Sequence, residues 1–324
     1  MGIDRERVAH RVVRVLAAGA LLCWLAAIAA HSVEAKVPGP NGRIAFARYA
    51  SKLGDTITYT ADPDGTHRVR LFPGASGSPH WSPDGSRIVI SACADPPVCD
   101  TAAVIVDPDT GTARVLRMPA AATLFTGCTV WSPDAKRLAC EGDGQTDPGL
   151  NGVYTIRSSD GRGLIRLTSN PGGVDTPIDY APDGTRIVFA RTDPRRRPGS
   201  NEALFVVEVD GSGVHRITPW GYSDDDGSWS PDGSKIAFEH DGSLFVVHPD
   251  GRCLTRIRLA IPADDAAGDF SWSPDGSRIL FLLIQDDGHE GIATANADGG
   301  DVRVVTDSPT FDSKGDWGTH PLIG

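Results

Sequence analysis

The sequence lacks the short motifs that mark most hydrolytic, nucleotide-binding and zinc-dependent sites. It has no Gly-x-Ser-x-Gly elbow, no Walker loop and no His-Glu-x-x-His pair, and His289-Glu290 stands without a second histidine. Positive charge is also scarce, because 31 Lys and Arg face 42 Asp and Glu, for a formal net charge of −11. An acidic surface repels a phosphate backbone, so we expect no nucleic-acid partner.

The hydrophobic run at the N-terminus is short for a membrane span, which needs about 20 residues. Four arginines precede the uncharged segment Val15–Ala30, and Val33-Glu34-Ala35 offers modest side chains before a cut after Ala35. This order is typical of a secretory signal. We predict a signal peptide over residues 1–35 and an exported protein that is secreted, periplasmic or attached to the cell envelope. An uncleaved membrane anchor is the alternative.

One motif recurs through the rest of the chain. Its copies begin at an aromatic residue and continue as Ser-Pro-Asp-Gly or a close variant: Trp81–Gly85, Trp131–Ala135, Tyr180–Gly184, Trp229–Gly233, Trp272–Gly276 and a degenerate Asp316-Trp317-Gly318. A β-rich run such as Arg186-Ile-Val-Phe189 follows each complete copy, and two more strands are expected after each run. Four strands per repeat, taken six times, predict an all-β six-bladed β-propeller over residues 42–318. A linker at 36–41 precedes it and a tail at 319–324 follows.

The two ends of the repeat array are complementary. The first copy begins at its second strand, Arg43-Ile-Ala-Phe46, and the last copy stops after its first strand at Trp317. We therefore expect the last strand to complete the first blade, which closes the ring and covers the open edges. We also expect the repeated aromatic residues to pack between blades.

The repeated turn has a chemical explanation. Proline presets φ at the first corner, aspartate suits the second, and glycine takes the left-handed position of a three-residue hairpin loop. Ala135 replaces that glycine in one copy. A left-handed alanine costs on the order of 1 kcal/mol, so this hairpin is either strained or built on another turn.

The repeated Trp-Ser-Pro-Asp-Gly, followed by Arg/Lys-Ile-x-Phe, resembles the propeller repeats of TolB-like (WD-repeat-like) proteins. The resemblance covers about residues 42–318. TolB proteins are extracytoplasmic and belong to a cell-envelope complex, so the resemblance implies the same kind of location and a protein or envelope partner. They also carry an α/β domain before the propeller. Only Lys36–Asn41 occupies that place here, so we expect a TolB-like propeller without that domain.

Removal of the leader would leave five cysteines. Cys128 and Cys140 each lie six residues from Asp134 at the centre of a turn. In a three-residue hairpin loop they face each other across two strands, at a separation that suits a disulfide. Cys93 and Cys99 flank a Pro-Pro loop and form a second candidate pair, which leaves Cys253 unpaired. Export permits such bonds, and reduced thiols packed as small apolar groups are the alternative.

The topology also suggests where a ligand binds. The connections between second and third strands share one face and are long in four repeats: Ala47–Thr56, Ser91–Ala102, Glu141–Gly152 and Ala190–Glu202. Insertions on one face of a repeat array often mark the binding side. If the first strand is innermost, positions one and three before the aromatic share a side at the channel mouth: His80, Asp179, Asp226, Asp269 and Asp316, with Lys314. We predict an acidic funnel for a cation or a basic peptide segment, beside a basic loop at Arg195-Arg196-Arg197. Ordinary solvated strand ends are the alternative.

These observations favour an exported, monomeric, non-catalytic propeller that binds a protein or a cell-envelope ligand. An enzyme of the lyase, lactonase or hydrolase type, with its site at the channel mouth, is the alternative, because propellers host such enzymes. A purely structural envelope component is a third reading. The sequence indicates no catalytic residue and no cofactor. Asp224-Asp225-Asp226-Gly227 has part of a calcium-loop pattern, so Ca²⁺ is the cation that it suggests, and a solvated acidic turn explains the same residues.

Overall fold

The computed structural model describes residues 39–323, apart from 96–97, 117–123, 145, 198–200, 221–226 and 309. The side chains of 93–95, 98–101, 124–126 and 314 also lie outside that description. The predicted leader, Asp226, the side chain of Lys314 and the Cys93–Cys99 pair are therefore outside the described residues.

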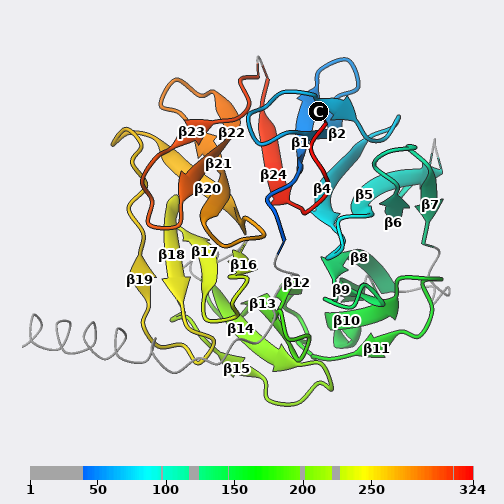
Figure 1. The fold of residues 1–324 in the computed structure, drawn as a ribbon. Coiled ribbons are helices and arrows are strands. Elements are labelled where there is room, and N and C mark those ends of the chain that lie inside the picture. Colours follow the sequence, from blue (N-terminus) through cyan, green and yellow to red (C-terminus); the bar gives the residue numbers. More distant parts are fainter. Residues whose placement is uncertain are drawn as a thin grey trace, which may run out of the picture.

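The described chain forms six four-stranded antiparallel sheets that stand around a central channel (Figure 1). The innermost strands are β24 (Asp312–Trp317), β4 (Ser76–Trp81), β8 (Leu124–Trp131), β12 (Asp175–Tyr180), β16 (Gly227–Trp229) and β20 (Ala266–Trp272). The second strands are β1 (Ile44–Ala50), β5 (Ile88–Asp95), β9 (Arg137–Gly144), β13 (Arg186–Thr192), β17 (Ile236–His240) and β21 (Arg278–Ile284). The third strands are β2 (Asp55–Ala61), β6 (Val98–Val106), β10 (Gly152–Arg157), β14 (Glu202–Glu208), β18 (Ser243–Val247) and β22 (Glu290–Asn296). The outer strands are β3 (Val69–Arg70), β7 (Ala113–Val115), β11 (Ile165–Arg166), β15 (His215–Arg216), β19 (Thr255–Arg256) and β23 (Arg303–Val304).

The predicted six-bladed propeller is thus confirmed. Blade 1 contains β24 and β1–β3, and blades 2 to 6 follow in chain order with four strands each. A 3-10 turn, η1 (Pro148–Leu150), lies between β9 and β10. Among the described residues, no helix is long and apolar enough to cross a membrane.

The hydrophobic core lies between the blades. Each of the hydrophobic clusters joins two adjacent blades, and each contains one aromatic residue of the repeat. Trp229, which is 1% exposed, packs with Val188 of blade 4 and Ile236 of blade 5. The expectation that these aromatic residues pack between blades is correct. Burial of their large apolar rings holds each blade to the next.

The ring closes as the complementary ends predict. β24 pairs with β1, with Trp317 opposite Ile44, so the last strand completes blade 1. The indole Nε1 of Trp317 donates to the carbonyl oxygen of Gly42 at 2.9 Å. Beyond the strand, the ring of His320 stacks on Trp81 of blade 2 with 5.2 Å between ring centroids. The closure therefore combines a β-ladder with packing against the next blade.

The repeated turns have the predicted left-handed residue, but each loop has four residues rather than the predicted three. The residue before the proline pairs with the residue five positions later, as the N–H of Ser132 does with the carbonyl oxygen of Arg137. Gly85, Gly184, Gly233 and Gly276 have φ between 68° and 70°, in the left-handed region. Ala135 has φ of 56° and donates its N–H to the carbonyl oxygen of Ser132, as the glycines do in their own turns. Of the two outcomes expected for this hairpin, the structure has the strained one, because the alanine keeps the common turn.

The cysteine predictions have different outcomes. Cys128 and Cys140 lie opposite each other on β8 and β9 and form the predicted disulfide, with 4.0 Å between their Cα atoms. Cys253 is disulfide-bonded as well, so the expectation of an unpaired cysteine at this position is wrong.

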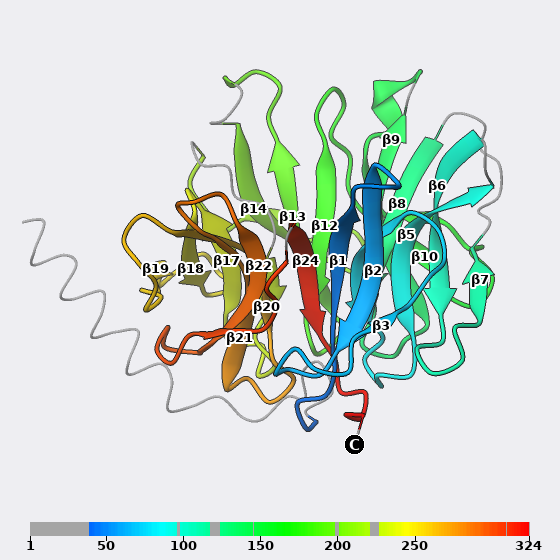
Figure 2. The ribbon, with the colours of Figure 1, turned by 90° about the horizontal axis from the view of Figure 1, so that it is seen from above.

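The second-to-third-strand connections gather on one face, which is uppermost in Figure 2. Two of the four predicted long loops are mostly strand. β1 continues to Ala50 and β2 begins at Asp55, so the connection is only 51–54. The strand extends because Arg48 of β1 forms two 2.6 Å hydrogen bonds with the buried carboxylate of Asp312 in β24. In blade 2, β5 likewise continues to Asp95 and β6 begins at Val98.

Candidate functional site

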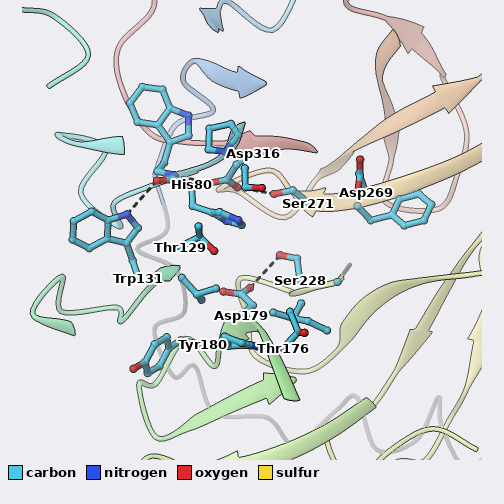
Figure 3. Close-up of a pocket in the computed structure, with 18 of the residues that line it drawn as sticks. His80, Thr129, Trp131, Thr176, Asp179, Tyr180, Ser228, Asp269, Ser271 and Asp316 are labelled. Carbon is cyan, nitrogen blue, oxygen red and sulfur yellow. Dashed lines mark hydrogen bonds between the residues drawn. The ribbon is translucent and has the colours of Figure 1, made fainter. Parts of the chain in front are cut away.

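A cavity of about 360 Å³ lies in the central channel. The inner strands of all six blades contribute to its walls (Figure 3). Because each inner strand belongs to a different repeat, residues far apart in the sequence meet there. The cavity lies within the range of about 300–1,000 Å³ that is usual for ligand pockets.

Four of the five predicted site residues line this cavity. They are His80, Asp179, Asp269 and Asp316, whereas Asp226 is outside the described residues. Pro83, Pro133 and Pro182 of the repeated turns line the same cavity. The predicted residues therefore lie inside the channel, close to the tight-turn end, rather than at a mouth among the long connections. The reason is that they directly precede the aromatic residue that ends each inner strand.

We predicted that residues one and three positions before each aromatic residue face the same side of the inner strand. In two inner strands a β-bulge breaks this alternation. The pairing register shifts between Gly268 and Ser271 in β20, and between Pro177 and Asp179 in β12. Asp269 sits within such a bulge with φ of 52°. A bulge inserts one unpaired residue, so the period-two alternation fails across it. In Figure 3, Asp269 accordingly stands apart from Ser271 and Asp316.

Asp179 connects two inner strands. Its Oδ2 accepts hydrogen bonds from the backbone N–H of Trp229 at 2.9 Å and from the hydroxyl of Ser228 at 3.2 Å. Both donors belong to β16 of the next blade. The carboxylate is thus held in a fixed orientation beside the cavity, and it also links blade 4 to blade 5.

Asp316 has the same role in another part of the ring. Its Oδ2 accepts from the backbone N–H of Trp81 at 2.7 Å, and its Oδ1 accepts from the hydroxyl of Ser271 at 2.8 Å. Trp81 begins the turn of blade 2, and Ser271 belongs to blade 6. Asp316 therefore links blade 1 to both neighbours. Charge-assisted bonds of this kind are about twice as strong as neutral ones.

Sequence reasoning missed the hydroxyl groups of the site. Ser228 and Ser271 occupy the position directly before the aromatic residue, where other repeats have His80, Asp179 and Asp316. Aligning the repeats at that position would have found them. Thr129 and Thr176 also line the cavity, and Thr176 donates its hydroxyl to Glu141 at 2.6 Å.

The described charged side chains of the cavity have one sign of charge. Asp179, Glu202, Asp269 and Asp316 line it, and among the described side chains of its walls there is no lysine or arginine. His80 adds an imidazole, which Figure 3 shows on the same side as Asp316. Burial raises the pKa of Tyr180, so its phenol stays neutral. The walls therefore favour a positively charged or hydrogen-bond-donating guest.

The residues described do not form a metal centre. Within the described part of the chain, no group of three or more His, Cys, Asp and Glu side chains could hold a metal ion. The Asp224–Asp226 segment that suggested Ca²⁺ lies outside that part. The expectation of a bound cation therefore stays untested.

Comparison with known proteins agrees with the repeat. The TolB beta propeller domain matches residues 101–299. An uncharacterized protein of Agrobacterium fabrum is 34% identical over 171 residues, which are 52% of this chain and 52% of that protein, so the match spans about half of the relative's length.

Two solved structures share the fold. TolB from Acinetobacter baumannii is 21% identical with a TM-score of 0.67, and the match covers 85% of this chain and 66% of that chain. A putative TolB from Agrobacterium tumefaciens is 16% identical with a TM-score of 0.63, with 87% and 93% covered. The repeated motif, the six blades and the match of residues 101–299 to the domain agree: the chain belongs to the TolB beta propeller domain family.

Proposed function

We propose that the protein is an exported, non-catalytic binding platform whose channel cavity takes a cationic side chain or short basic segment of a protein partner. The observation that carries this proposal is the composition of the walls: four carboxylates and no described lysine or arginine line one cavity of about 360 Å³. Clefts lined by one sign of charge between low-dielectric walls concentrate ligands of the opposite sign.

The fixed carboxylates support this function. The backbone N–H of Trp229 and the hydroxyl of Ser271 hold Asp179 and Asp316 in place before any ligand arrives. A preorganised acceptor loses little conformational entropy when it binds. The same bonds would let the site recognise a cation without rearrangement of the ring.

Two observations support an extracytoplasmic location. The sequence predicts a signal peptide at residues 1–35, and Cys128–Cys140 form a disulfide in the described structure. Disulfides persist in oxidising compartments and are rare in the cytosol. We therefore place the proposed partner outside the cytoplasm or at the cell envelope.

The test is a calorimetric titration of the full chain with an octapeptide of alternating lysine and alanine. Asp179→Asn keeps an oxygen that can accept from Trp229 but removes the charge. We expect it to weaken binding about tenfold, which corresponds to about 1.4 kcal/mol. The matched control is Asp250→Asn, whose side chain is 56% exposed on a turn of blade 5. It removes the same charge and should leave the affinity unchanged.

Either of two results would contradict the proposal. One is equal binding of the lysine peptide and a glutamate peptide of the same length. The other is an equal effect of Asp179→Asn and Asp250→Asn. Thermal unfolding of both variants checks that the ring remains folded.

A further inference from the structure

A basic and aromatic surface lies on blade 4, on the face of the long connections. Arg195 and Arg196 belong to the connection between β13 and β14, and Arg216 ends the outer strand β15. Trp220 follows β15, where the chain has returned to the same face. We call Arg195, Arg196, Arg216 and Trp220 the arginine–tryptophan patch.

Aromatic stacking fixes two of these arginines. The guanidinium carbon of Arg196 lies 4.8 Å from the ring centroid of Trp220, and that of Arg216 lies 5.8 Å from it. Trp220 in turn rests edge-on against Phe205 of β14, with 5.6 Å between centroids. Stacked arginines lose less rotamer freedom on binding, and their N–H edges remain available as planar forks.

Among the described side chains, the arginine–tryptophan patch has three arginines and one paired carboxylate. Asp193 is the carboxylate that pairs with both Arg195, at 2.9 Å, and Arg196, at 3.4 Å. The side chain of Arg195 is nevertheless 88% exposed and that of Arg196 is 43% exposed. Within the described part of a chain with a net charge of −11, this is a local reversal of sign. Charge complementarity therefore predicts an anionic partner.

The same blade contains one anion that a stacked arginine binds. Arg191 stacks on Phe205 at 5.1 Å and donates two hydrogen bonds, of 2.7 and 2.6 Å, to the buried carboxylate of Asp175. A stacked arginine with a bidentate carboxylate is thus already present on the ring of Phe205, which Trp220 also contacts. Arginine forks match carboxylates in this way, whereas lysine does not.

We propose that the arginine–tryptophan patch docks an acidic segment of a partner polypeptide. A polypeptide is favoured over an anionic polysaccharide because Arg216 lies on β15, the outer edge strand of its sheet. An extended peptide can reach the main chain of an edge strand and the guanidinium groups beside it, and a polysaccharide cannot extend a sheet. This site is distinct from the channel cavity in position, sign of charge and preferred ligand.

The probe is a fluorescent octapeptide of alternating glutamate and alanine, whose binding to the full chain is followed by anisotropy. The test variant is Arg196→Gln with Arg216→Gln. The matched control is Arg252→Gln with Arg303→Gln, which removes two charges at side chains that are 83% and 68% exposed on blades 5 and 6. We expect at least a tenfold loss of affinity for the test variant and less than a twofold loss for the control.

A second variant separates orientation from charge. Trp220→Leu keeps every arginine but removes the stacking ring, and we expect a threefold to tenfold loss. The proposal is overturned if the test and control doubles lose affinity equally, or if Trp220→Leu binds as tightly as the wild type. It is also overturned if polygalacturonate of equal charge binds and the glutamate peptide does not. Lysine-peptide binding in the channel should be unchanged in all three variants, so failure of one site is distinguishable from failure of the other.

Discussion

At the tight-turn end of the ring, five repeats have the same Pro-Asp turn, and each turn closes with a residue in the left-handed region. At the opposite end, the connections between second and third strands range from 241–242 in blade 5 to 193–201 in blade 4. The uniform end packs blade against blade through buried aromatic residues. The variable end has the exposed arginines and the half-buried Trp220. The difference indicates that one end holds the ring together and that the other can vary without opening it.

The largest expected effect comes from a comparison of two tryptophans, one at each end of the ring. Trp229, at the tight-turn end, is 1% exposed, and Arg186 stacks on its ring at 5.1 Å. We expect Trp229→Ala to lower the free energy of unfolding by about 3–5 kcal/mol, because it leaves a cavity between two blades. Trp220→Ala should cost roughly 1–2 kcal/mol, because that ring is only half-buried. Urea denaturation of both variants measures the difference between the two losses in the free energy of unfolding. Equal losses would contradict the distinction between the two ends of the ring.

The disulfide of blade 3 sharpens the comparison. Cys128–Cys140 closes a loop with a sequence separation of 12, and it ties β8 to β9 well beyond the tight turn. We expect Cys128→Ser with Cys140→Ser to lower the free energy of unfolding by about 2–3 kcal/mol. Adding a reductant to the wild type should cause at least that loss, because it also breaks the disulfide of Cys253. A variant as stable as the wild type would show that the turn alone holds this hairpin.

A reciprocal pair of substitutions tests the turn itself. Ala135→Gly should raise the free energy of unfolding by about 1 kcal/mol, because it relieves a left-handed alanine. Gly184→Ala creates the same situation in blade 4, where the nearest heavy atom to the new Cβ would be 3.8 Å away, on Pro133. It should cost about 1 kcal/mol through backbone strain, without a clash. Effects of the same sign in the two variants would contradict this explanation.

The smallest expected effect concerns pH. Burial would raise the pKa of Asp232, but hydrogen bonds from Ser230 and Ser234 outweigh it and hold that pKa below its ordinary value. A lowered pKa in the folded state stabilises the protein above about pH 4, and this contribution is lost as the pH falls through the folded value. Ser230→Ala removes one donor, so it should raise the pKa of Asp232 and shift acid unfolding to higher pH. At neutral pH we expect a loss of about 0.5–1 kcal/mol.

Acid titrations followed by circular dichroism test that shift. Blade 4 provides a natural comparison, because Ala181 already stands where the other turns have serine. An acid midpoint that does not move, or that moves to lower pH, would contradict the role given to Ser230.

Sequence reasoning reached most of the fold because the fold is repetitive. The Trp-Ser-Pro-Asp-Gly copies located the inner strands and the tight turns. The Cys128–Cys140 pair was found although its hairpin loop has four residues rather than three, because a register shift between Cys128 and Val130 brings the two cysteines opposite each other. The strand end of blade 1 was missed because the hydrogen bonds that hold Arg48 in a strand go to Asp312, which lies far along the chain. Periodicity cannot show such a partner.

The candidate site was predicted in composition but not in geometry. His80, Asp179 and Asp316 were found because they precede a repeat aromatic by one position. The separate placement of Asp269 depends on a bulge, and alternation alone gives no sign of one. The links from Asp179 to Trp229 and from Asp316 to Trp81 depend on contacts between blades, which the sequence of one repeat does not show.

The central claim is that the channel cavity binds a cationic segment. Photo-crosslinking tests it most directly, with a lysine octapeptide that has one photoreactive residue and with mass spectrometry to map the sites. We predict crosslinks to residues of the cavity walls, such as Thr129 and Thr176, and their loss in Asp179→Asn. Crosslinks confined to the outer strands, or unchanged in that variant, would contradict the claim.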